Sequence, residues 1–91
     1  MKNNDRVARI EARLRQRLAP DRLEIVDESA QHAGHAGARS GGGHFAATIV
    51  SNRFEGLNPV QRHRLVYEAL GDLMKTDIHA LSVRALTPKE L

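Results

Sequence analysis

The sequence contains no cysteine and no tryptophan, and only three aromatic side chains, Phe45, Phe54 and Tyr67, among its 91 residues. Without cysteine, the chain can form no disulfide and supplies no thiolate ligand to a metal. No apolar stretch approaches the roughly 20 residues that a membrane-spanning helix needs. The amino-terminal segment alternates charged and apolar residues, unlike a secretory signal. We therefore expect one small cytoplasmic domain with no membrane partner.

Positive charge is concentrated near the amino end. Residues 1–22 carry a net charge of +4, whereas the whole chain carries +3. Surfaces that bind nucleic-acid phosphates are basic, so DNA is one partner to consider. The excess charge is small, however, and so few aromatic side chains offer little for stacking on bases. The pattern therefore favours a solvated basic helix face over a nucleic-acid interface.

Apolar periodicity predicts the element order α-β-β-α-β in a single α/β domain of the α+β type over residues 1–91. A stripe of apolar residues from Val7 to Leu18 predicts an amphipathic helix over residues 5–18. Alternating patterns predict strands over residues 22–27, 44–51 and 78–86. A second helix is expected over residues 59–74, with a capping pattern at Asn58 and an interruption at Gly71. Residues 29–43, rich in glycine, alanine and histidine, predict a flexible loop.

The histidines are predicted to gather at one edge of a three-stranded mixed sheet packed against helices. A helical crossover normally joins parallel strands, so the second and third strands should begin at the same end. His44 and His79 open these strands, although 35 residues separate them. The loop carrying His32 and His35 enters at this end, and only His63, on the second helix, is left out. Neutral imidazole binds zinc, copper, iron and nickel, which makes this edge a candidate metal site.

Other chemistry is poorly supported by the sequence. No serine lies in a nucleophile elbow, and the glycines at residues 41–43 lack the Gly-Lys-Ser/Thr ending of a phosphate-binding loop. Asp27 and Glu28 are adjacent on a strand and point to opposite faces, which does not favour a paired-carboxylate site. We therefore expect a protein that is not an enzyme.

The chain resembles the BolA-like family over essentially its whole length, from about Val7 to Leu91. Four blocks carry the resemblance, in the family's order and spacing: EIVDES at 24–29 followed by His32, HF at 44–45, RFEGL at 53–57 leading to QRHRLVY at 61–67, and IHAL at 78–81 with Thr87-Pro88. The resemblance implies a KH-like fold, which agrees with the element order above. It also implies a non-enzymatic role.

Members of this family pair with monothiol glutaredoxins and share a [2Fe-2S] cluster in iron–sulfur assembly and iron handling. The resemblance implies that the partner supplies a cysteine thiolate and bound glutathione supplies a second. The resemblance also implies that the histidine of the IHAL block, here His79, is one ligand from this chain and that a loop residue supplies the other. Because this chain has no cysteine, it resembles the subgroup with a loop histidine. His32 is the matching residue, and His35 stays open as a substitute. No cofactor is expected in the isolated chain.

A second hypothesis comes from family members described as transcriptional regulators. It assigns DNA contacts to a basic central segment that includes Arg53, Arg62 and Arg64, with the first helix as a further contact. Under the first hypothesis, Arg62, His63 and Arg64 would instead form a charged rim of the glutaredoxin docking surface. The two hypotheses do not exclude each other, and the sequence favours the cluster role.

Overall fold

The computed structural model describes residues 3–28 and 43–91. His32, His35 and nearly all of the predicted loop lie outside these residues. The elements follow the predicted order, with short additions: α1 (Asn3–Leu18), β1 (Arg22–Asp27), β2 (Gly43–Val50), η3 (Asn52–Phe54), α2 (Pro59–Leu70), α3 (Leu73–Thr76), β3 (Ile78–Leu86) and η4 (Pro88–Glu90). In the part of the chain described, no helix has the length and apolar character to cross a bilayer.

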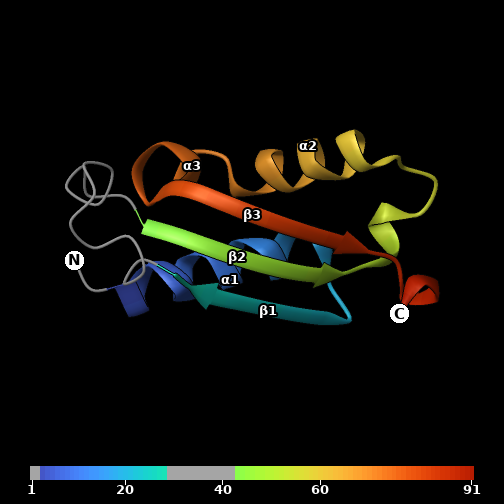
Figure 1. Cartoon of the computed structure of the whole chain (residues 1–91), viewed down its shortest axis with the longest axis horizontal. Coiled ribbons are helices and arrows are strands. Elements are labelled where there is room, and N and C mark those ends of the chain that lie inside the picture. Colours follow the sequence, from blue (N-terminus) through green and yellow to red (C-terminus); the bar gives the residue numbers. More distant parts are fainter. Residues whose placement is uncertain (1–2, 29–42) are drawn as a thin grey trace.

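The three strands form one mixed sheet in the order β1-β2-β3. β1 pairs antiparallel with β2, and β2 pairs parallel with β3. The parallel pair is the one that the helical crossover predicts. The crossover from β2 to β3 passes through η3, α2 and α3 and brings the starts of the two strands to the same end of the sheet (Figure 1). The α/β fold class and the mixed sheet are therefore confirmed.

The helices cover one face of the sheet and leave the other open. Alternate residues of β2, Phe45, Ala47 and Ile49, are at most 2% exposed because they point toward the helices. The predicted stripe of α1 is buried against them, except that Val7 is only partly covered. The main buried helix and crossover residues are Ile10, Leu14, Leu18, Phe54, Val66, Ala69, Leu70 and Leu73. One apolar core therefore lies between the sheet and its helices.

The predicted boundaries of three elements need correction. The helix expected over residues 59–74 ends at Leu70, because Gly71 has φ +55°, a left-handed value that interrupts the helix, and α3 follows as a separate turn. β2 begins and ends one residue earlier than predicted, and α1 starts at Asn3. The start of α2 is as expected: Asn58 and Gln61 exchange side-chain and backbone hydrogen bonds in a capping box.

Arg62 fastens the C-terminal turn to the rest of the fold. Its guanidinium donates to the carbonyl of Leu57 at 2.9 Å and to that of Ala85 at 3.1 Å. It also donates to both carboxylate oxygens of Glu90, at 2.7 and 3.2 Å. These hydrogen bonds, together with one from the Thr87 backbone N–H, lower the pKa of Glu90 from 4.5 to about 2. The ion pair therefore ties the end of β3 and η4 to the start of α2.

The Arg62–Glu90 pair predicts a pH-dependent contribution to stability. Because the folded pKa of Glu90 is lowered, the pair stabilises the fold above pH 4.5 and loses this contribution as the pH falls toward about 2. Urea unfolding of the native chain should therefore weaken more steeply across this window than unfolding of Glu90→Gln, which keeps the side-chain acceptor but not the charge. Parallel pH profiles for the two proteins would contradict this assignment.

Candidate metal-binding edge

Two histidines from different strands meet at the start of the parallel pair. The imidazole rings of His44 on β2 and His79 on β3 have their centroids 5.0 Å apart and their planes at 46°. The convergence predicted for these two residues is therefore present. His79 is exposed and His44 is partly buried. The pair lies at the end of the sheet that is farther from the chain's C-terminus (Figure 1).

A β-bulge places His79 in this position. Gly43 is the partner of Ile78, but the next residue of β2, His44, is the partner of Ala80. His79 is thus an extra residue in β3, opposite no residue of β2. Ile78 is buried, His79 and Ala80 are both exposed, and inward packing resumes at Leu81. Bulges of this kind redirect a side chain next to functional sites, and here the extra residue is the predicted ligand.

Backbone hydrogen bonds fix the strands on both sides of the histidine pair. The N–H of Gly43 donates to the carbonyl of Asp77 at 3.0 Å, and the N–H of Glu28 donates to the carbonyl of His44 at 2.8 Å. The first bond ties β2 to the residue before the bulge, and the second ties it to the end of β1. The start of β2 is therefore held on both sides, by Glu28 just after β1 and by Asp77 just before β3.

Asp77, just before the bulge, is a buried carboxylate held by α1. Arg9 donates to its Oδ2 from Nε and from a terminal guanidinium nitrogen, each at 2.6 Å, and Thr76 Oγ1 donates to its Oδ1 at 3.0 Å. Burial raises the pKa of Asp77, but the hydrogen bonds from Arg9 and Thr76 and the charges of Arg9 and Arg6 outweigh it. The net effect is a pKa below the usual value. Asp77 is therefore ionised at neutral pH.

The histidine pair has the chemistry of an incomplete metal site. Two imidazoles that bind one tetrahedral metal at about 2.0–2.1 Å have ring centres about 5 Å apart, so the observed separation of 5.0 Å fits shared ligation. Among the described residues, no group of three or more His, Cys, Asp or Glu side chains is placed to hold a metal ion. A metal held here needs ligands from outside these residues.

The other predicted site residues lie elsewhere. Arg53 in η3, and His63 and Arg64 in the first turns of α2, are exposed, but they are near the end of the sheet opposite the histidine pair (Figure 1). The rings of His63 and Tyr67 are neighbours, with centroids 6.4 Å apart. Arg62 has a side chain only 15% exposed and is engaged by Glu90. The structure therefore separates these residues from His79.

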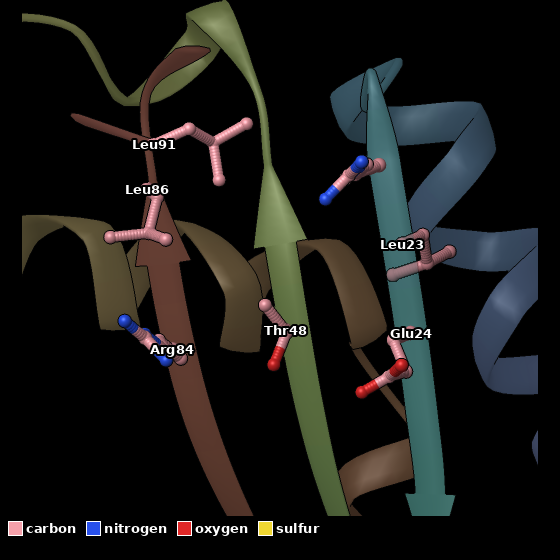
Figure 2. A pocket seen from close by; sticks show the side chains of 7 residues that line it. Leu23, Glu24, Thr48, Arg84, Leu86 and Leu91 are labelled. Atoms are coloured by element: carbon pink, nitrogen blue, oxygen red, sulfur yellow. The ribbon is translucent and has the colours of Figure 1, made fainter. Parts of the chain in front are cut away.

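The open face of the sheet carries a shallow groove that the sequence did not indicate. One rung across the three strands is formed by Glu24, Thr48 and Arg84 (Figure 2). The groove has a volume of about 440 Å³, and its other lining residues are Arg22, Leu23, Leu86 and Leu91. Its mixed charges match no metal-binding or phosphate-binding pattern, so we assign no ligand to it.

Sequence reasoning did not find the bulge or the Arg9–Asp77 ion pair. A one-residue insertion in a strand leaves little trace in an apolar pattern, although the two consecutive polar or small residues His79 and Ala80 are a weak sign of it. Arg9 and Asp77 are 68 residues apart. Only the packing of α1 against α2 and the residues before β3 brings them together.

The chain is similar to known proteins over most of its length. A family model described as BolA-like protein matches residues 14–90. BolA-like protein 1 from Mus musculus is 47% identical over 83 residues, which is 91% of this chain and 58% of the mouse protein. SufE-like protein 1, chloroplastic/mitochondrial, from Arabidopsis thaliana is 47% identical over 88 residues, 91% of this chain and 24% of that protein. The chain therefore spans less than two thirds of either relative.

A bacterial relative and a solved structure match over a larger share of their own length. The DNA-binding transcriptional regulator BolA of Escherichia coli is 43% identical over 82 residues, 90% of this chain and 75% of that protein. The solved BolA domain of SufE1 from Arabidopsis thaliana has a TM-score of 0.81 and 45% identity, and the match covers 92% of this chain and 93% of the domain. The similarity thus extends to both sequence and fold.

The bulge predicts that alanine substitutions at two adjacent residues differ strongly in their effect on the free energy of unfolding. Ile78 is 5% exposed and packs in the core, so Ile78→Ala should lower the free energy of unfolding by about 2–5 kcal/mol. His79 is exposed, so His79→Ala should change it by no more than about 0.5 kcal/mol. Urea unfolding monitored by circular dichroism measures both. A large loss of stability in His79→Ala would show that the imidazole supports the fold.

Proposed function

Because the chain belongs to the BolA-like protein family, we propose that it is a non-enzymatic adaptor that pairs with a monothiol glutaredoxin and co-ligates a shared [2Fe-2S] cluster. The observation that carries this proposal is the contact between His44 and His79, with ring centroids 5.0 Å apart. In the proposed role, the cluster is cargo in iron–sulfur assembly and iron handling. The chain's part is to offer nitrogen ligands at an accessible edge.

The donor set of the chain fits a shared cluster better than one held alone. Iron–sulfur clusters are usually held by thiolates, and this chain has no cysteine. A partner thiolate and the thiolate of glutathione bound to that partner would supply the ligands that the chain lacks. Two neutral imidazoles in place of two thiolates at one iron raise the reduction potential, the trend known from Rieske centres. The proposal therefore requires both partner and glutathione.

The position of His79 supports binding between two proteins. As the extra residue of a bulge, His79 is exposed at the end of the sheet instead of facing the core. A ligand shared with a second protein has to project from the surface, where the partner's thiolate can approach. No backbone rearrangement is needed to present His79.

The identity of the second imidazole is open among three residues. Resemblance to the family favours His32 in the loop, with His35 as a substitute, and both lie outside the described residues. His44 is the described imidazole that lies against His79. Single substitutions at each of these positions separate the three.

The cluster proposal predicts a specific spectral result. The purified chain is titrated into cluster-loaded monothiol glutaredoxin with glutathione, and visible circular dichroism is recorded. We expect a new spectrum that saturates at one chain per glutaredoxin and is absent with His79→Ala, because an iron ligand is lost. Among His32→Ala, His35→Ala and His44→Ala, the variant that also loses the spectrum identifies the second ligand.

His63→Ala is the matched control for this titration, because it removes an imidazole near the other end of the sheet. We expect the same spectrum at saturation, with any change confined to the concentration required. An unchanged spectrum with His79→Ala would exclude this residue as a ligand. No new spectrum with an excess of the native chain would refute the proposed function.

DNA binding is the second candidate function. It is supported by the description of the Escherichia coli relative as a DNA-binding transcriptional regulator and by the exposure of Arg53 and Arg64. These residues lie near the end of the sheet opposite the histidine pair, so one chain has room for both activities. Because Arg62 is paired with Glu90, it is less available to bind phosphate than Arg53 and Arg64 are.

The DNA hypothesis predicts binding that depends on both sequence and salt. Arg53→Gln and Arg64→Gln should each weaken binding and reduce the slope of log K against log salt by about 1, since each removes one phosphate contact. Arg84→Gln, which removes an equal charge from the open face, is the control and should change neither. Fluorescence anisotropy with labelled DNA provides the measurement. Binding without sequence preference that vanishes near physiological salt would contradict a regulatory role.

The expected cytoplasmic location stays a prediction. The Arabidopsis relative described above is named as chloroplastic and mitochondrial, so members of this family are found in more than one compartment. Monothiol glutaredoxin and glutathione need to be present wherever the proposed adaptor works.

A further inference from the structure

β3 is anchored by an arginine–carboxylate pair at each end. At its start, Arg9 of α1 contacts Asp77, the residue before the strand, at 2.6 Å. At its end, Arg62 of α2 contacts Glu90, just after the strand, at 2.7 Å. Only the first pair lies next to the histidine contact. The two pairs have the same chemistry, but only Arg9–Asp77 fixes the backbone beside the histidines, whereas Arg62–Glu90 fixes the C-terminal turn.

Asp77 is engaged through its backbone and its side chain at once. Its N–H donates to the carbonyl of Leu73 at 2.9 Å, and its carbonyl accepts from the N–H of Gly43 at 3.0 Å. Its two carboxylate oxygens accept from Arg9 and from Thr76. Asp77 thus connects α1, α3 and the first residue of β2 at the point where β3 begins.

The bulge has little packing of its own to hold it. His79 is exposed and opposite no residue of β2, so its side chain contributes few contacts that would fix its backbone. The flanking residues are fixed, by burial at Ile78 and by the carboxylate at Asp77. Loss of Arg9 would remove two contacts at 2.6 Å from this buried carboxylate and leave it with the charge of Arg6 but without those contacts. Such a loss is costly for a buried charge, so Asp77 would move toward water and shift the adjoining backbone.

We propose that Arg9 and Asp77 are positioning residues that hold the bulge, and thereby keep the imidazole of His79 beside that of His44. Arg9 touches neither histidine and acts only through Asp77 and the backbone that follows it. The consequence for cluster binding rests on the proposed function, whereas the consequence for the histidine contact does not.

The first test measures the histidine contact in the isolated chain. Nuclear Overhauser effects between the ring protons of His44 and His79 report their separation, and hydrogen exchange of the Gly43 amide reports its bond to Asp77. Asp77→Asn and Arg9→Gln should weaken the ring contact and speed Gly43 exchange by about tenfold or more. Glu90→Gln, which breaks the matched pair at the other end of β3, should leave both signals unchanged.

Two further variants separate positioning from general stability. Arg9→Lys keeps the charge but not the double contact, so it should restore part of the ring contact. In Arg9→Gln with Asp77→Asn, both partners are neutral, so the combined effect should be smaller than the sum of the single effects. If Asp77→Asn does not fold, Arg9→Gln and Arg9→Lys carry the test, because the side chain of Arg9 is 39% exposed and its replacement leaves no cavity in the apolar core.

The second test repeats the cluster titration with these variants. The shared cluster should form with Arg9→Gln but decay several-fold faster than with the native chain, and Glu90→Gln should match the native chain. An unchanged ring contact and Gly43 exchange in Arg9→Gln would overturn the positioning role. If the native chain forms no cluster while the ring contact still depends on Arg9, the proposed function fails and the positioning role stands.

Discussion

The parallel pairing of β2 with β3 decides where the candidate ligands of this protein can lie. His44 and His79 are far apart in sequence, and nothing local brings them together. They meet because a helical crossover returns the chain to the same end of the sheet before the third strand begins. His79 is the extra residue of the bulge and is exposed there. Pairing supplies the proximity, and the bulge supplies the orientation.

Much of this arrangement was predictable from the sequence, because it depends on periodicity and on chirality. The apolar stripe from Val7 to Leu18, the alternation in β2 and the capping residues at Asn58 each specify a local structure that packing reinforces. The direction of β3 followed from the crossover alone. The end of α2 at Gly71 was expected only as an interruption, since a lone glycine near a helix end is compatible with continuation as well as with termination.

The parts that could not be predicted depend on long-range contacts. The sequence pattern indicates a solvated helix face for Arg9 and the other arginines of α1, and only the fold gives Arg9 a buried partner, Asp77, just before β3. The sequence indicates one basic surface made of Arg53, Arg62 and Arg64. In the structure, however, the guanidinium of Arg62 donates hydrogen bonds to Leu57, Ala85 and Glu90. A side chain's charge is visible in the sequence, but whether that charge is already neutralised depends on residues far along the chain.

The absence of cysteine and the exposure of His79 have a joint consequence. Under the proposed function, a chain that supplies only imidazoles binds iron–sulfur cargo weakly by itself, and occupancy depends on a thiol-bearing partner. A storage protein needs tight ligation to retain a cluster, whereas an adaptor of the proposed kind has to release the cluster to a recipient. The site therefore needs a defined geometry without tight binding. The two proposals together meet this requirement, because an Arg9–Asp77 pair that holds the bulge would orient His79 and add nothing to the strength of a bond from its imidazole to iron.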